Sequence, residues 1–93
     1  MKEKLEKIIN KDEDLQTNLN LISDFLKENY DIDLYFCEIF GDRRWSFFAG
    51  SEDVIAQNKK IKINKNLGII IDNYSQINKS KWEEIVEFIK SLI

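Results

Sequence analysis

Residues 31–50, DIDLYFCEIFGDRRWSFFAG, contain the pattern that decides the fold. Apolar and polar side chains alternate here with the period of two that is typical of a β-strand. Gly41 and Asp42 interrupt the alternation, and a glycine at the first central position of a turn favours a two-residue type II′ connection. The stretch therefore predicts an antiparallel hairpin whose strands cover residues 31–40 and 43–49.

The length of this turn decides which side chains share a face of the hairpin. With two residues in the turn, Phe36 faces Phe47, and Trp45 faces Glu38 with Arg43 diagonal to that carboxylate. This register predicts Trp45 and Phe47 on the face that forms the core, and an ion pair between Glu38 and Arg43. A three-residue connection would reverse the faces.

The other face of the predicted sheet is apolar as well. In the predicted register it carries Tyr35, Ile39 and Phe48. One layer of helices covers only one face of a sheet, and an uncovered aromatic face on a small domain is typical of an interface. The pattern therefore predicts a contact surface on this face that includes Tyr35, Phe48 and Arg44.

Helical spacing precedes the hairpin over residues 2–29, where apolar side chains recur every three or four positions. Two interpretations of this segment stay open. Asp12 or Asp14 caps a second helix, or one continuous helix runs through the acidic run. We favour two helices because Asn and Asp prefer turns and N-caps to helix interiors.

The C-terminal segment 79–92 shows the clearest helical stripe in the chain. Ser80 and Glu83 match a capping box, and Asn78 is an alternative N-cap. Between the hairpin and this helix, residues 59–64 alternate Lys and Ile as in a half-buried strand. Residues 67–71 form the most apolar strand and are expected at the centre of the sheet.

These elements predict one α+β domain over residues 1–93, with a helical segment 2–29, a sheet within 31–72 and a C-terminal helix 79–92. The expected order is α(α)-β-β-(short α)-β-β-α, with a short helix after Ser51. The sheet has four mainly antiparallel strands, and the helices pack on one face. This order resembles the topology of GAF, profilin-like and roadblock-type modules, without a residue motif that would assign a site.

Composition argues against most enzyme classes. The 93 residues contain no His and no Pro, 3 Gly and 1 Cys. The commonest general base and metal ligand is therefore missing, and an internal disulfide is excluded. Cys37 is expected to be a buried thiol. Asp31 and Asp33 share one side of a strand start, but nothing in the pattern brings them together with Glu38 as an acid–base pair in a cleft. The run 12–14 lacks the glycine of a calcium loop. We expect no enzyme, no cofactor and no metal.

The net charge of −3 is unevenly distributed, with 7 basic and 13 acidic residues in 1–58 and 7 basic and 4 acidic residues in 59–93. The basic residues cluster around the predicted strands: Arg43, Lys59, Lys60, Lys62 and Lys65. Beside exposed aromatics, such a patch favours single-stranded nucleic acid. Because total charge is negative and lysines also protect edge strands, nucleic acid ranks third among our interpretations.

The first interpretation is a small non-enzymatic interaction or regulatory module. We expect it to form a homodimer, or to bind a protein partner, through the sheet face or the N-terminal helices. The second is a small-ligand sensor with a shallow apolar pocket on that face, formed by Tyr35, Ile39, Phe48 and Tyr74. A lone cysteine, the lack of a signal-peptide pattern and the absence of a long apolar run favour the cytoplasm and no membrane span.

Overall fold

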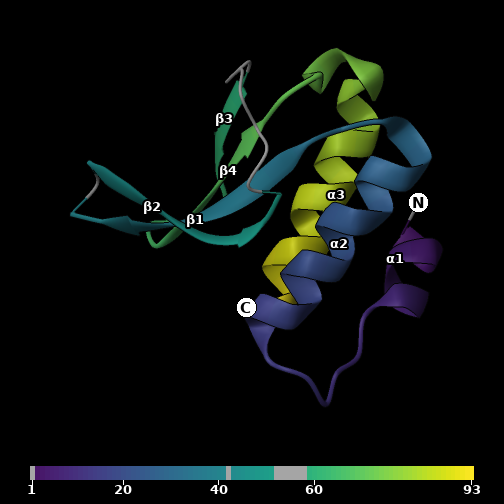
Figure 1. Cartoon of the computed structure of the whole chain (residues 1–93), viewed down its shortest axis with the longest axis horizontal. Helices are drawn as coiled ribbons and strands as arrows, with labels where there is room; N and C mark the ends of the chain where they lie inside the picture. The colour runs from purple at the N-terminus through teal and green to yellow at the C-terminus, as the bar shows by residue number, and fades with distance from the viewer. Residues whose placement is uncertain (1, 42, 52–58) are drawn as a thin grey trace.

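The computed structural model describes residues 2–41, 43–51 and 59–93. The elements in chain order are α1 (Lys2–Ile8), α2 (Leu15–Tyr30), β1 (Leu34–Phe40), β2 (Arg44–Gly50), β3 (Lys59–Lys62), β4 (Leu67–Ile71), the 3-10 helix η1 (Tyr74–Gln76) and α3 (Lys79–Leu92) (Figure 1). The α+β fold with a four-stranded antiparallel sheet is confirmed. The predicted short helix after Ser51 lies outside the described residues.

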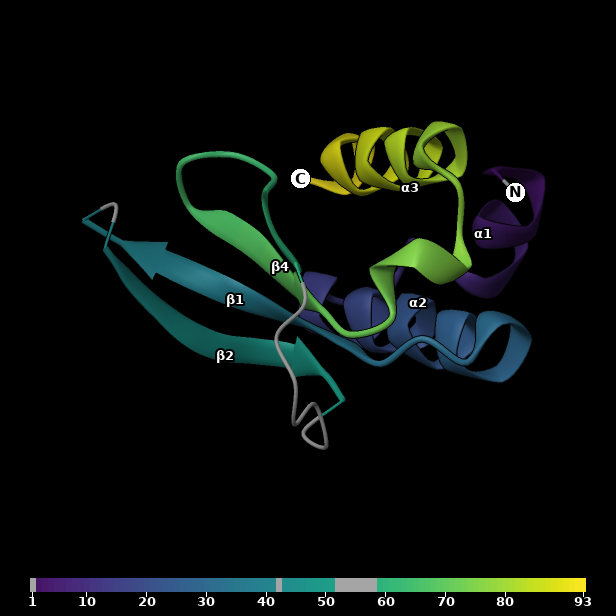
Figure 2. The ribbon, with the colours of Figure 1, turned by 90° about the horizontal axis from the view of Figure 1, so that it is seen from above.

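The sheet has the strand order β2-β1-β4-β3, and every neighbouring pair is antiparallel. All five residues of β4 are buried, as expected for the most apolar strand at a central position. The strands β2 and β3 are the two edges. Figures 1 and 2 show that the β1–β2 hairpin extends well beyond the ends of the helices.

The core lies between one face of this sheet and the three α-helices. We call this side the helix face. Its fully buried side chains come from every layer: Leu5, Leu19, Ile22, Leu26, Leu34, Phe36, Ile69, Ile71, Trp82, Ile85 and Ile89. The opposite side is called the far face. Cys37, Ile39 and Ile70 are buried there, outside the main cluster.

The N-terminal segment forms two helices, which confirms the favoured interpretation. The side chain of Asp14 accepts a hydrogen bond from the backbone N–H of Thr17, at 2.8 Å, and so caps α2. This bond lowers the pKa of Asp14. Asn10 and Asn18 exchange two hydrogen bonds of 2.9 Å each, which fixes the connection between the helices.

The N-cap of α3 is Asn78, whose side chain accepts from the backbone N–H of Lys81 at 2.9 Å. The helix begins at Lys79, so Ser80 already lies inside the first turn. The capping-box alternative at Ser80 is therefore wrong. Both residue types cap well, and the local sequence does not separate two candidates two positions apart.

The hairpin connection differs from the prediction. β1 ends at Phe40 and β2 begins at Arg44, so three residues connect the strands. Near the connection, Trp45 pairs with Ile39 and Phe47 pairs with Cys37. Both aromatic residues of β2 therefore lie on the far face, and the prediction that they join the main core is wrong.

A β-bulge farther along the hairpin then returns Ala49 to its predicted face, whereas Phe48 lies on the face opposite to its prediction. The register shifts between Phe36 and Cys37, so that Phe36 pairs with Ala49. Phe48 is the extra residue of β2, and it packs against the main core. Its carbonyl accepts a 2.7 Å hydrogen bond from the Gln16 amide of α2, which holds the bulge against the helix layer.

Candidate functional site

The projecting β1–β2 hairpin carries the most exposed aromatic side chains among the described residues. Phe40 is 52% exposed and Phe47 is 46% exposed. Phe40 pairs with Arg44 on the helix face, whereas Phe47 pairs with Cys37 on the far face. The two phenyl rings therefore lie on opposite faces of the hairpin. The hairpin therefore offers apolar surface on both sides, at the end of the sheet that the helices do not reach.

The far face of the hairpin is an aromatic layer over a small second core. The rings of Tyr35 and Phe47 lie 5.7 Å apart, centroid to centroid. Trp45 crosses from β2 over β1 to β4, where a side chain at Gly68 would overlap its ring. The Lys60 ammonium lies 5.5 Å from the centroid of the Trp45 ring, within the range of a cation–π contact.

This layer shelters the centre of the far face within one chain. Cys37, Ile39 and Ile70 are each less than 5% exposed. The expectation of a broadly uncovered apolar face is therefore wrong at the centre of the sheet. The exposed aromatic surface is restricted to the hairpin, around Phe47.

Only one of the three predicted contact residues lies on the far face. Tyr35 is there and is half-buried. Phe48 and Arg44 both lie on the helix face, because the three-residue connection shifts the alternation of β2 by one position. The prediction that all three share one surface is wrong, since each alternation was counted from a two-residue turn.

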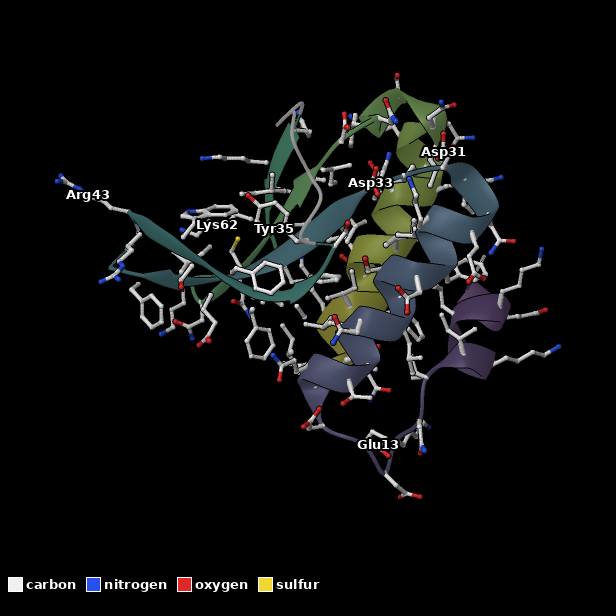
Figure 3. The ribbon with its side chains drawn as sticks, in the orientation of Figure 1. Glu13, Asp31, Asp33, Tyr35, Arg43 and Lys62 are labelled. Atoms are coloured by element: carbon white, nitrogen blue, oxygen red, sulfur yellow. The ribbon has the colours of Figure 1, made fainter. Side chains whose placement is uncertain are left out.

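The predicted basic patch is divided between the two faces of the sheet. Lys60 and Lys62 pair with far-face positions of β4, whereas Lys59 pairs with Ile71 on the helix face. The Lys59 ammonium lies 5.4 Å from the ring of Tyr74. Figure 3 shows Arg43 at the projecting end of the hairpin.

The remaining basic residue, Lys65, lies in the turn between β3 and β4. Because β4 runs antiparallel to β1, this turn and the hairpin connection are at the same end of the sheet. That end is therefore basic, with Arg43, Arg44 and Lys65 around it.

The predicted small-ligand pocket on the far face is not assembled from the residues expected to line it. Tyr74 stacks on Trp82 with ring centroids 5.2 Å apart, beside α3. Ile39 is buried on the far face, and Phe48 is on the helix face.

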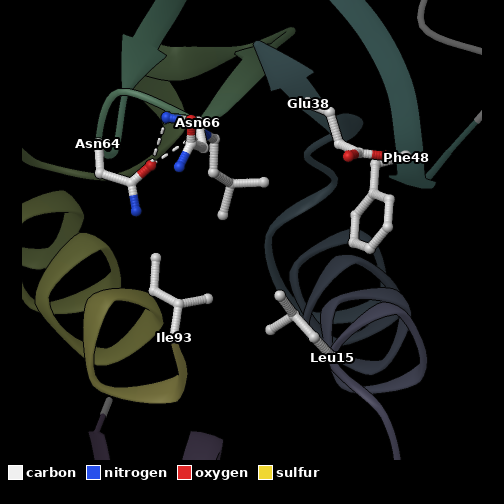
Figure 4. A pocket seen from close by; sticks show the side chains of 7 residues that line it. Leu15, Glu38, Phe48, Asn64, Asn66 and Ile93 are labelled. Carbon is white, nitrogen blue, oxygen red and sulfur yellow. Dashed lines mark hydrogen bonds between the residues drawn. The ribbon is translucent and has the colours of Figure 1, made fainter. Parts of the chain in front are cut away.

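Phe48 instead lines a different cavity, where the hairpin overhangs the ends of α2 and α3. This hairpin pocket has a volume of about 240 Å³ and is lined by Leu15, Glu38, Phe48, Asn64, Asn66, Leu67 and Ile93. Figure 4 shows Glu38 and the two Asn side chains on the sheet side, with Leu15 and Ile93 on the helix side. Its residues come from five separate places in the sequence, so no local pattern predicts it.

Of the groups considered for catalysis, the carboxylates of Asp31 and Asp33 form ion pairs and the thiol of Cys37 is buried. The Lys27 ammonium lies 3.3 Å from Asp31 and 3.2 Å from Asp33. Its hydrogen bond to Asp33, followed by that to Asp31, raises the pKa of Lys27, so it stays charged between them. Burial raises the pKa of Cys37, which keeps its thiol protonated at neutral pH.

Within residues 2–41, 43–51 and 59–93, no three acidic or Cys side chains come close enough together to hold a metal ion. No helix in this described part of the chain has the length and apolar character needed to cross a bilayer. Comparison with protein-family models, with curated proteins and with solved structures finds no match in any of the three. Function is therefore argued from the hairpin and its surroundings.

Proposed function

We propose that this protein is a non-enzymatic interaction module that self-associates through the β2 edge of its projecting hairpin. The observation that carries the proposal is the difference between the two edges of the sheet. β3, with the sequence KKIK, has lysines at three of its four positions. β2, with the sequence RWSFFAG, has none and exposes Phe47.

Lysines on an edge strand oppose pairing with another chain, because pairing would bring their charges together and remove them from water. The β3 edge is therefore protected. On β2 the one charged residue is Arg44, at the end of the strand, and over 45–50 the edge has no such protection. An unprotected edge strand is a template for backbone pairing with a second chain.

Helix α2 occupies only one end of the β2 edge. There, Gln16 donates to the Phe48 carbonyl, and the Asn20 side chain accepts from the Gly50 N–H at 2.7 Å. Toward the hairpin connection, over 44–47, no hydrogen bond from another described residue covers the outer edge of β2. This stretch lies beyond the helices, and it is where the proposal places the partner strand (Figure 1).

A second copy of the same chain fits this stretch. Two β2 strands that pair antiparallel about a two-fold axis present the same surface to each other, as a closed homodimer requires. The sheet then continues from one protomer into the next, and Phe47 and Trp45 of each chain lie across the new strand pair from those of the other.

The N-terminal helices do not support the alternative dimer that the sequence suggested. Leu5 of α1 is fully buried against its own chain. The apolar side of α1 is therefore buried within its own chain. As part of the proposal we place the protein in the cytosol, because its lone Cys37 is an unpaired thiol.

Sedimentation velocity over a wide range of protein concentration tests the proposal. We expect reversible dimerisation of the wild-type chain, and a monomer at all concentrations for Phe47→Lys, which gives β2 the kind of protection that β3 has. The matched control is Phe40→Lys, the same change on the same hairpin but on β1 and on the helix face. It should still dimerise.

A wild-type chain that stays monomeric at the highest concentration would contradict the proposal, as would a Phe47→Lys variant that dimerises normally. Circular dichroism melting of each variant shows whether the fold is retained.

Single-stranded nucleic acid is a second candidate, favoured by one observation. Lys60 and Lys62 share the far face with Tyr35, Trp45 and Phe47, so a strand lying there would meet both cations and rings. Fluorescence anisotropy with a labelled oligothymidine tests this candidate. Binding must be strong at low salt and must weaken steeply as salt is added.

A further inference from the structure

The hairpin pocket has an apolar side that remains accessible to a ligand. Leu15 and Phe48 are half-buried, and Ile93 is 48% exposed at its rim. Leu15 comes from α2 and Ile93 from the end of α3, and both lie across the pocket from the overhanging hairpin, which supplies Phe48 (Figure 4). A ligand that covers them removes apolar surface from water, which favours binding.

Among the side chains that line the pocket, one is charged, the carboxylate of Glu38 on its polar side. The ion pair predicted with Arg43 does not form, and no ion pair joins Glu38 to any residue in the described ranges. Glu38 pairs with Ser46 on one neighbouring strand and with Leu67 on the other, and neither side chain can neutralise it. Its charge is therefore available to a ligand.

The side-chain oxygen of Asn64 is already engaged. It accepts hydrogen bonds from the backbone N–H groups of Asn66 and Leu67, at 2.7 and 2.9 Å. The turn between β3 and β4 is thereby fixed, and it forms a firm wall of the pocket opposite Phe48 (Figure 4).

We propose that the hairpin pocket binds a small amphipathic amine, with its ammonium group at Glu38 and its apolar body against Leu15, Phe48 and Ile93. A carboxylate over an otherwise apolar lining selects a cation attached to an apolar body. The Phe48 ring adds a favourable face for the same cation. A volume of about 240 Å³ lies below that of drug-sized sites and suits a ligand with one ring or one short alkyl chain.

The positive charges of two basic residues near the pocket disfavour a cationic ligand, so the test includes an anionic probe. Arg44 shares the helix face with Glu38, two residue pairs closer to the hairpin connection, and Lys65 lies in the neighbouring turn. Were they to dominate the field of the pocket, an anion would bind better than a cation. An anionic probe of the same shape distinguishes the two cases.

The experiment is a titration followed by two-dimensional amide NMR of the ¹⁵N-labelled chain. The three probes have the same phenyl ring and differ in their end group: 2-phenylethylammonium, 2-phenylethanol and 3-phenylpropionate. We expect saturable shifts at the amides of Glu38, Asn66 and Leu67 with the ammonium probe. The alcohol should bind about tenfold more weakly, and the carboxylate should not saturate.

Three variants locate the interaction. Glu38→Gln should reduce the affinity for the ammonium probe about tenfold and leave that for the alcohol unchanged. Ile93→Ser should weaken both probes, because it removes apolar surface. Glu84→Gln, which changes an exposed acid on α3 away from the pocket, is the matched control and should change nothing.

The proposal is overturned if the carboxylate probe binds as well as the ammonium probe, if Glu38→Gln has no effect, or if the shifts lie elsewhere. It is independent of self-association. The Phe47→Lys variant changes the far face only and should bind the ammonium probe like the wild type, whether or not the chain dimerises.

Discussion

The contact between Gly68 and Trp45 shows how one residue decides the arrangement of the far face. Gly68 lies at the centre of the sheet, in a strand whose other four residues are Leu or Ile. A side chain at this position would overlap the Trp45 ring, which reaches from β2 across β1 to β4. The absence of a Cβ at Gly68 is therefore what lets Trp45 cover the second core.

Gly68→Ala should destabilise the fold by about 1–3 kcal/mol, the usual cost of forcing extra volume into a packed site. Trp45→Leu removes the group that the new Cβ meets. The double variant should therefore lose less stability than the sum of the two single variants. Urea unfolding of the four proteins gives this coupling, and strictly additive losses would show that the ring does not lie over Gly68.

At the scale of elements, the length of the hairpin connection decides which face each side chain of β2 occupies, and the N-caps decide where the helices begin. A change from two to three residues in the connection moves Trp45 and Phe47 to the far face, and the bulge at Phe48 moves Ala49 back to the helix face. The helix ends are decided in the same local way. The hydrogen bond from Lys81 N–H to Asn78 sets the beginning of α3.

Asn78→Ala should cost about 1 kcal/mol, because the change leaves a backbone N–H of the first turn without its side-chain partner. Ser80→Ala is the matched control. Ser80 lies inside the helix, where Ala is the better helix former, so this variant should be neutral or slightly more stable. Thermal unfolding of both distinguishes the two caps, and a larger loss for Ser80→Ala would show that the capping box is the true start.

For the whole molecule, α1 completes the helix layer. It contacts both α2 and α3, and its Leu5 side chain is fully buried in the common core. The first helix is therefore part of the domain and not an arm reserved for a partner. The proposed self-association is therefore assigned to the projecting hairpin and not to α1.

Leu5→Ala should destabilise the protein by about 2–5 kcal/mol, the usual range for truncating a buried leucine. The loss should be the same at all protein concentrations below the onset of dimerisation. Lys7→Ala, an exposed change on the same helix, is the control and should have little effect. If Leu5→Ala leaves the melting temperature unchanged and instead alters the sedimentation coefficient, α1 packs on another chain.

Much of the fold could be predicted from the sequence, because the decisive signals are local. The helical spacing before residue 30, the stripe of α3 and the apolar run 67–71 each report which side of one element is buried. The two helices in the N-terminal segment followed from the preference of Asp for N-caps, and the structure has Asp14 in that position.

The candidate site could not be predicted in the same way. The sequence predicts the correct face for Tyr35 but not for Phe48 and Arg44, because the faces of these two residues depend on the turn length, and the face of Ala49 depends on a bulge as well. The turn length and the bulge depend on small local preferences and on the contacts of Phe48 and Gln16 between β2 and α2. Those contacts exist only once the layers are assembled.

The amino-acid pattern alone thus determined which segments are helices or strands and that they form one α+β domain, since periodicity records burial along a single element. Tertiary structure alone decided that Trp45 shelters the far face, that β2 and β3 are the edges, and that Glu38 meets Leu15 and Ile93 in one pocket. These outcomes depend on contacts between residues far apart in the chain, and no local spacing encodes such contacts.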